Sequence, residues 1–119
     1  MKDNIILKKT FDFSVEVSKL VVHLRRKKEF VISKQLLRSA TSIGANVQEA
    51  TAAISKKDFI LKMSIASKEA RESYYWLNLL NSNRIIDIDY SNYLLQINEI
   101  IKILTAIIKT AQTNQNTKL

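Results

Sequence analysis

The sequence predicts an all-α protein, a single-domain antiparallel up-down-up-down four-helix bundle, from three observations. The 119 residues include one glycine and no proline, so the chain lacks the residues that form tight β-turns. Apolar residues recur at spacings of three and four in four successive segments, the pattern of helices with one buried face. The length suits one core, and short connections make consecutive helices antiparallel.

The first two helices are expected at residues 6–27 and 33–54. The buried stripe of the first is Phe13, Val17, Leu20 and Leu24, flanked by Phe11, Val15 and Val22. The stripe of the second is Leu36, Ala40, Ile43, Val47, Ala50 and Ile54. Ser33 is predicted to cap the second helix, because a serine oxygen can accept from its first free amides, and Ile32 with Leu37 would form a hydrophobic staple.

The third and fourth helices are expected at residues 56–81 and 89–112. The stripe of the third is Phe59, Met63, Ala66, Ala70, Ser73, Leu77 and Leu80. The stripe of the fourth is Tyr93, Ile97, Ile100, Leu104, Ile107 and Ala111. Ser55 and Asp58 have the spacing of a capping box, Ile54 and Phe59 that of a staple, and Asp87 or Asp89 would cap the fourth helix. The core would then cover residues 6–112, and we expect the polar residues 113–119 to be disordered.

The balance of charge predicts the class of partner. Lysine and arginine number 19 against 11 acidic residues, and the net charge of +8 favours nucleic acid first and acidic protein or membrane surfaces second. On the expected bundle these charges form two basic ends separated by a mildly acidic waist. The sequence contains no cysteine, which excludes disulfides, thiolate catalysis and cysteine metal sites and suits a cytoplasmic protein. No apolar run is long enough for a membrane span, and no targeting segment is recognisable.

Several of these residues also resemble a known family. They are Phe30-Val31-x-Ser33-x-Gln35-Leu36-x-Arg38-Ser39, Ser42-Ile43-Gly44-Ala45-Asn46-Val47-x-Glu49-Ala50, Ser55-x-x-Asp58-Phe59, Ile65-Ala66-x-Lys68-Glu69-Ala70-x-Glu72 and Trp76-Leu77-x-Leu79-Leu80. Over about residues 10–110 this pattern resembles the bacterial four-helix-bundle family of the protein encoded by intervening sequences of large-subunit ribosomal RNA genes. Ala40 stands where that pattern has glycine.

The resemblance carries its own expectations about assembly and partners. It implies a homo-oligomeric ring, a pentamer, without enzymatic activity and with a role in binding nucleic acid. Relatives include the accessory variability proteins of retroelements, which associate with a reverse transcriptase and nucleic acid. The resemblance therefore implies RNA or DNA and a protein such as a reverse transcriptase as partners.

The candidate nucleic-acid-binding residues surround the expected turn between the first two helices. They are Arg25, Arg26, Lys27, Lys28, Lys34 and Arg38. Such a cluster would neutralise phosphates without reading sequence. The alternative is a solvated turn on a protein-interaction scaffold or accessory subunit that does not contact nucleic acid itself.

Three further groups of residues are interpreted as structural. Gly44, inside a helix, indicates a close approach of two helices, either within the bundle or between subunits. A polar network at the waist would comprise Asn46, Glu49, Lys68, Glu69 and Glu72, with Glu49 paired to Lys68 or Arg71. An apolar strip off the core-facing stripe would form an oligomer interface through Leu61, Ile65, Trp76 and Leu79. For the run 74–76 we favour such an interface over base stacking.

Enzymatic alternatives lack essential residues. Glu69 and Glu72 have the spacing of a Mg²⁺-binding pair in all-helical nucleotide pyrophosphohydrolases, but Glu49 alone cannot supply the second pair that those enzymes need. A di-iron bundle requires Glu-x-x-His, and the residue three positions before His23 is Leu20 rather than glutamate. His23 is therefore expected to be a partly buried helix residue. We predict no catalytic residue, no metal site and no cofactor.

Overall fold

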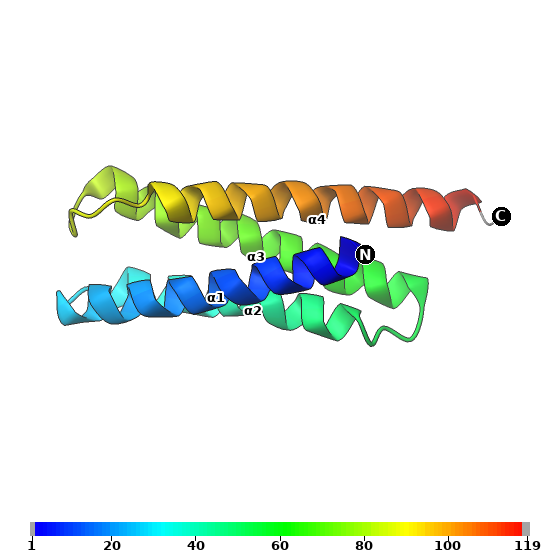
Figure 1. Ribbon diagram of the computed structural model, residues 1–119, viewed down its shortest axis with the longest axis horizontal. Helices are drawn as coiled ribbons and strands as arrows, with labels where there is room; N and C mark the ends of the chain where they lie inside the picture. Colours follow the sequence, from blue (N-terminus) through cyan, green and yellow to red (C-terminus); the bar gives the residue numbers. More distant parts are fainter. Residues whose placement is uncertain (1, 118–119) are drawn as a thin grey trace.

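The computed structural model describes residues 2–117, and within them the side chains of residues 5–114. It contains α1 (Lys2–Arg26), α2 (Val31–Ala50), α3 (Lys56–Asn83) and α4 (Ser91–Thr117), with no strand in that range. The four helices run alternately up and down one long axis in a bundle of 54 × 22 × 22 Å (Figure 1). The predicted all-α four-helix bundle is confirmed.

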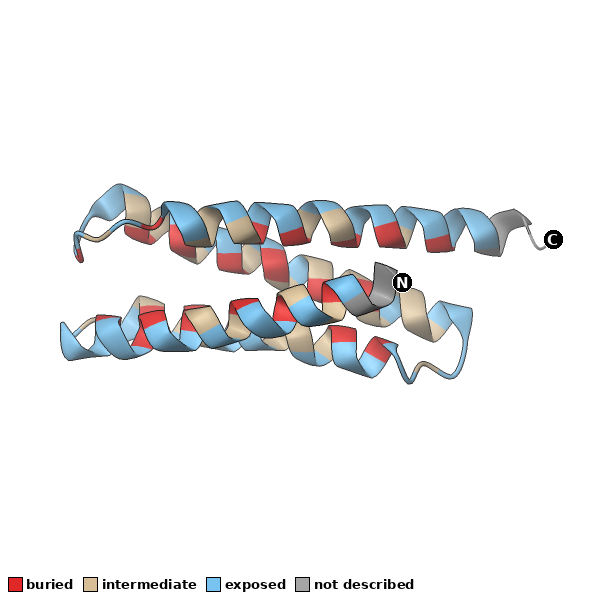
Figure 2. Cartoon of the chain, viewed as in Figure 1, coloured by how far each residue is buried: buried red, intermediate tan, exposed pale blue. Residues whose placement is uncertain are grey.

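The core consists mainly of the predicted stripes, which face inward from all four helices (Figure 2). The exceptions are Ile54, which is 94% exposed, and Phe59 and Tyr93, which are half-buried. Fully buried apolar side chains at spacings of three and four supply the main free energy of folding, since every such face is removed from water by its neighbours.

The bounds of α2 differ from the prediction at both ends. It begins at Val31 rather than Ser33, because the carboxylate of Glu29 caps it from outside the helix. It ends at Ala50, where the amide of Thr51 turns back to the carbonyl of Gln48 at 3.2 Å. The prediction that Ser33 caps α2 is therefore wrong. Ile32 lies inside the first turn of α2 rather than before the helix, so Ile32 and Leu37 do not occupy the positions of a hydrophobic staple.

The start of α3 follows the predicted cap at Ser55. The Ser55 hydroxyl accepts from the Asp58 amide at 3.0 Å, which is the predicted cap. The Asp58 carboxylate accepts from the amide of Ile54 at 3.2 Å, one residue before the N-cap amide that a capping box uses. The predicted staple between Ile54 and Phe59 is wrong, because Ile54 is exposed to solvent rather than packed.

The start of α4 is capped by Asp89, one of the two predicted candidates. Its carboxylate accepts from the Ser91 amide at 2.9 Å, whereas Asp87 forms an ion pair with Arg84. The hydrogen bonds from the Ser91 hydroxyl and amide hold the pKa of Asp89 below its ordinary value. At its far end α4 continues to Thr117, so residues 113–117 are helical where we expected disorder. Lys118 and Leu119 lie outside the described residues.

Gly44 lies against α1, which places the predicted close approach of two helices within the bundle. A Cβ at Gly44 would lie 3.4 Å from the Ser14 hydroxyl oxygen and 3.4 Å from the carbonyl oxygen of Thr10. The Ser14 hydroxyl also donates to the Ala40 carbonyl at 3.3 Å, a direct bond from α1 to α2. The close approach thus occurs between neighbouring helices of one bundle.

Candidate nucleic-acid interface

The connection between α1 and α2 is a tight turn that carries most of the predicted basic cluster. The amide of Glu29 donates to the Leu24 carbonyl at 2.9 Å, and the amide of Lys28 donates to the Arg25 carbonyl at 2.9 Å. This pair of bonds is a Schellman motif, with Lys28 in the left-handed conformation at φ 67°. Glycine usually occupies that position of the motif. Because lysine stands there in this chain, no glycine in the sequence marks the end of α1.

Glu29 closes the other side of the turn. Its carboxylate accepts from the amides of Val31, Ile32 and Ser33 at 3.2, 3.0 and 2.7 Å. The buried Ser33 hydroxyl, in turn, donates to the Glu29 carbonyl at 2.8 Å. Because this carboxylate occupies the positive end of α2, the free amides there are unavailable to a phosphate. An anion at this turn must be bound by side chains.

Cations with free head groups surround the turn. Those that form no ion pair among the described side chains are Arg25, Arg26, Lys27, Lys28 and Lys34. All five are exposed, and Glu29, the acidic residue among them in sequence, is engaged by backbone amides. The Arg25 guanidinium also lies over the ring of Phe30, with Cζ 5.1 Å from the ring centre. The result is an exposed, net positive surface with five cations and one carboxylate, which we call the basic turn, residues 25–34.

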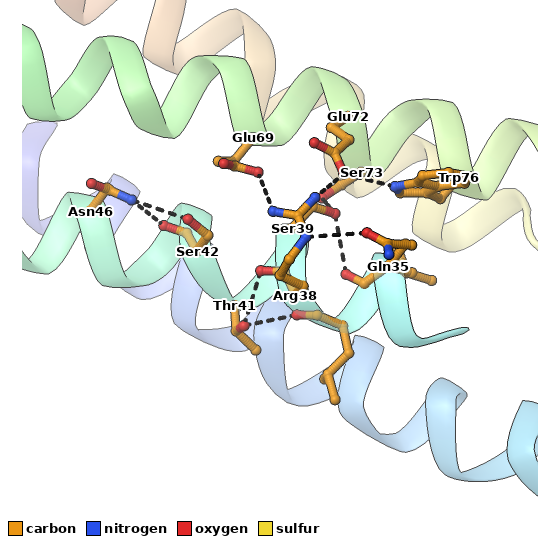
Figure 3. Close-up of polar contacts among 12 residues, drawn as sticks. Gln35, Arg38, Ser39, Thr41, Ser42, Asn46, Glu69, Glu72, Ser73 and Trp76 are labelled. Atoms are coloured by element: carbon orange, nitrogen blue, oxygen red, sulfur yellow. Dashed lines mark hydrogen bonds and ion pairs between the residues drawn. The ribbon is translucent and has the colours of Figure 1, made fainter. Parts of the chain in front are cut away.

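Arg38, the sixth predicted residue, belongs to a different arrangement. Its guanidinium forms ion pairs with Glu69, at 3.3 Å, and with Glu72, and it donates to the Gln35 amide oxygen at 3.3 Å (Figure 3). The hydrogen bond to Glu72 contributes most to raising the pKa of Arg38. Its charge is therefore largely compensated, and it joins α2 to α3.

The predicted waist network is divided into separate contacts. Asn46 donates to the carbonyl of Ser42 within α2 at 2.8 Å (Figure 3), and Glu49 pairs with Lys62 at 2.9 Å. The predicted pairing of Glu49 with Lys68 or Arg71 is wrong. Antiparallel register explains the difference, since residues near the end of α2 face residues near the start of α3, where Lys62 lies.

Glu72 links the ion pair to the aromatic side chain of Trp76. The Trp76 indole N–H donates to the Glu72 carboxylate at 3.0 Å (Figure 3). This bond, followed by those from Arg38 and the nearby charge of Lys68, lowers the pKa of Glu72 despite its partial burial. The carboxylate is therefore held in its charged form by donors on both helices.

The acidic residues in the described part of the chain are not grouped as a metal centre would require. Within the described part of the chain, no three His, Cys, Asp or Glu side chains are placed to hold an ion. Glu69 and Glu72 both bind Arg38. His23 is exposed near the end of α1 rather than partly buried as expected. Over the same described residues, no helix is long and apolar enough to cross a membrane.

The predicted interface strip on α3 is only partly exposed. Leu61 is 56% exposed, whereas Ile65, Trp76 and Leu79 are half-buried, and Trp76 packs against the core. Sequence reasoning missed larger exposed apolar side chains elsewhere, including Phe11 at 67% on α1. The sequence pattern predicts Phe11 beside the buried stripe, because spacing alone does not show how wide the buried face of a helix is.

The comparisons with known proteins agree with this architecture. A family model described as 23S rRNA-intervening sequence protein matches residues 2–106. A crystal structure of a protein of unknown function from the S23 ribosomal protein family of Bacteroides thetaiotaomicron is 48% identical, with a TM-score of 0.87. The match covers 92% of this chain and 99% of that one. No curated protein matches this chain.

Proposed function

The chain belongs to the 23S rRNA-intervening sequence protein family, and on this premise we propose that it binds nucleic acid, RNA or DNA, without sequence specificity and without catalysis. The observation that carries the proposal is the basic turn. Its free cations are Arg25, Arg26, Lys27, Lys28 and Lys34. The lysines at the opposite end of the bundle form ion pairs more often. Lys8 pairs with Asp12, Lys9 with Glu99 and Lys62 with Glu49.

The chemistry of the basic turn suits phosphates rather than base edges. Lysine and arginine side chains on an exposed turn can each reach a phosphate, and none is held by a partner in a fixed orientation toward a groove. Binding would release condensed counterions, so the affinity should fall steeply with salt. Neutralising about four phosphates would give a slope near −3 to −4 in log affinity against log salt on duplex.

Fluorescence anisotropy with a labelled structured RNA over a salt series tests the proposal. The variant Arg26→Gln/Lys27→Gln/Lys28→Gln/Lys34→Gln removes four charges from the basic turn and leaves the ring contact of Arg25 in place. The matched control Lys56→Gln/Lys57→Gln/Lys102→Gln/Lys109→Gln removes four exposed charges away from that turn.

The turn variant is expected to lose affinity by at least about tenfold and to flatten the salt slope, while the control stays within about threefold of the unmodified protein. Equal losses in both variants would show that net charge alone matters and would contradict the assignment to the basic turn. An affinity that does not respond to salt would reject the electrostatic mechanism.

A second candidate function is a protein-interaction scaffold or accessory subunit, favoured by the exposed apolar side chains of Phe11, Tyr75 and Leu95. Such residues suit a protein partner, for example a reverse transcriptase as in the relatives named above. Pull-down of the tagged protein before and after nuclease treatment separates the two functions. A partner retained after nuclease supports the scaffold, whereas loss of all partners supports binding through nucleic acid.

We also propose that the protein forms a homo-oligomer, a pentamer by resemblance to its relatives, and acts in the cytoplasm. The exposed Leu61 and the half-buried Ile65 and Leu79 of α3 would lie at the contact between subunits. A ring would repeat the basic turn around one end and raise its affinity through multivalency. Light scattering that gives the monomer mass of 13.7 kDa at micromolar concentration would reject assembly.

A further inference from the structure

Phe30 is an exposed aromatic residue in the middle of the basic turn. It immediately precedes α2, and 49% of its surface is exposed although the Arg25 guanidinium lies over its ring. Among the residues whose side chains are described, 23 other apolar residues are buried in the core, Phe13 among them. Here the ring remains in contact with water, between cations that precede and follow it in sequence.

The backbone around Phe30 is fixed before any ligand arrives. The Schellman bonds to Leu24 and Arg25 hold the preceding residues, and Glu29 fixes the amides of the three residues that follow. The Arg25 guanidinium, 5.1 Å from the ring centre, covers one face of the ring, and 49% of the residue remains exposed for a ligand. A ligand that stacks on Phe30 would therefore lose little affinity to the ordering of the turn.

We infer that Phe30 is a stacking platform and that the basic turn selects unpaired nucleotides over duplex, an inference that rests on the proposed function. Bases of a single strand present a free face that can stack on an aromatic ring, whereas duplex bases are already stacked on each other. The neighbouring Arg26, Lys27 and Lys28 would then bind the phosphates on either side of the stacked base. Because Glu29 blocks the amides of α2, these side chains are the phosphate ligands of the site.

The test compares a labelled unstructured single-stranded RNA with an RNA duplex that carries the same number of phosphates, at one salt concentration. Phe30→Ala is expected to weaken single-strand binding about fivefold or more and duplex binding less than about twofold. Tyr75→Ala is the matched control, because Tyr75 is 58% exposed on α3 and lies against Trp76 rather than in the turn. It should change neither affinity.

Two further substitutions separate stacking from apolar contact. Phe30→Tyr keeps an aromatic face and should retain the preference for single strands, whereas Phe30→Leu should behave like Phe30→Ala.

A third substitution, Phe30→Trp, reports stacking directly, because its fluorescence should be quenched by the single strand more than that of the unmodified protein. The one tryptophan of the unmodified protein, Trp76, donates its N–H to Glu72 and lies on α3. Circular dichroism of each variant verifies that the bundle is folded.

The outcomes distinguish this inference from the proposed function. If the four-charge turn variant loses RNA but Phe30→Ala weakens both RNAs equally or neither, nucleic-acid binding stands and stacking is rejected. If Phe30→Leu retains the preference, an apolar contact replaces stacking and the inference is again rejected. A protein that binds neither RNA, including one that binds only vesicles of anionic lipid, rejects the proposed function and the platform together.

Discussion

The hydroxyl groups of Ser39 and Ser73 lie 2.8 Å apart inside the bundle and join α2 to α3 (Figure 3). Both residues are fully buried, and the Ser39 hydroxyl also donates to the Leu36 carbonyl at 3.3 Å. With that bond made, Ser73 donates to Ser39, and neither hydroxyl is left without a partner. Each serine is the neighbour in sequence of a residue of the α2–α3 ion pair, Ser39 of Arg38 and Ser73 of Glu72.

A double-mutant cycle measures the energy of this pair. Ser39→Ala and Ser73→Ala should each lower the free energy of unfolding by about 1–2 kcal/mol, because each leaves one buried hydroxyl with a lost partner. The double variant should lose clearly less free energy of unfolding than the sum of the two single variants, since neither hydroxyl remains to be left unpaired. Urea unfolding followed by circular dichroism measures all four proteins. Additive losses would show that the hydroxyls do not interact.

Gly44→Ala should stabilise the bundle by about 0.5–1 kcal/mol, because alanine is the better helix former. The new Cβ would lie 3.4 Å from its nearest neighbours in α1, an ordinary contact distance, so no clash offsets this gain. Ala45→Gly is the matched control at an exposed position and should lose a similar amount. Thermal unfolding compares them. A lower melting temperature for Gly44→Ala would show that the space between α1 and α2 is too narrow for the added Cβ.

Lys28→Gly should raise the free energy of unfolding by about 0.5–1 kcal/mol, because the left-handed backbone at φ 67° strains a lysine but not a glycine. Lys27→Gly, one residue earlier and without a positive φ, should be destabilising by a similar amount. The two variants remove the same charge, so chemical unfolding isolates the backbone effect. Equal changes in both would contradict the assignment of strain to Lys28.

The fold was predictable because helical periodicity is repeated along almost the whole chain. Stripes such as Leu36 to Ala50 fix which face is buried, and the Ser55 cap on the Asp58 amide fixes where α3 begins. The start of α2 was not predictable in this way. Its cap is Glu29, a residue outside the helix whose side chain folds back, while Ser33 has the sequence of a cap but is buried by tertiary packing.

The basic residues of the candidate site could be predicted as a cluster in the sequence, but their ion pairs with other helices could not. Sequence proximity placed Arg38 with the basic turn, whereas the α2–α3 register directs it toward Glu69 and Glu72 on α3. Phe30 gave no sequence signal as a ligand-binding residue, because an apolar residue beside a helix start is equally compatible with burial, and only the structure shows it 49% exposed. Pairings across helices depend on register, and register is set by packing that local sequence does not specify.

The pH dependence of stability should report the environment of Glu72. Its folded pKa is lowered, chiefly by the Trp76 indole and then by Arg38, so its stabilising contribution is present above the ordinary carboxyl pKa of about 4.3 and is lost as the pH falls through the folded pKa. The free-energy difference between the unmodified protein and Glu72→Gln should therefore be constant at neutral pH and shrink in acid. Urea unfolding across pH measures it. The same comparison in a Trp76→Phe background, which lacks the indole donor, should show a weaker dependence on pH. A difference that stays constant into acid in both backgrounds would show that neither donor stabilises the Glu72 carboxylate.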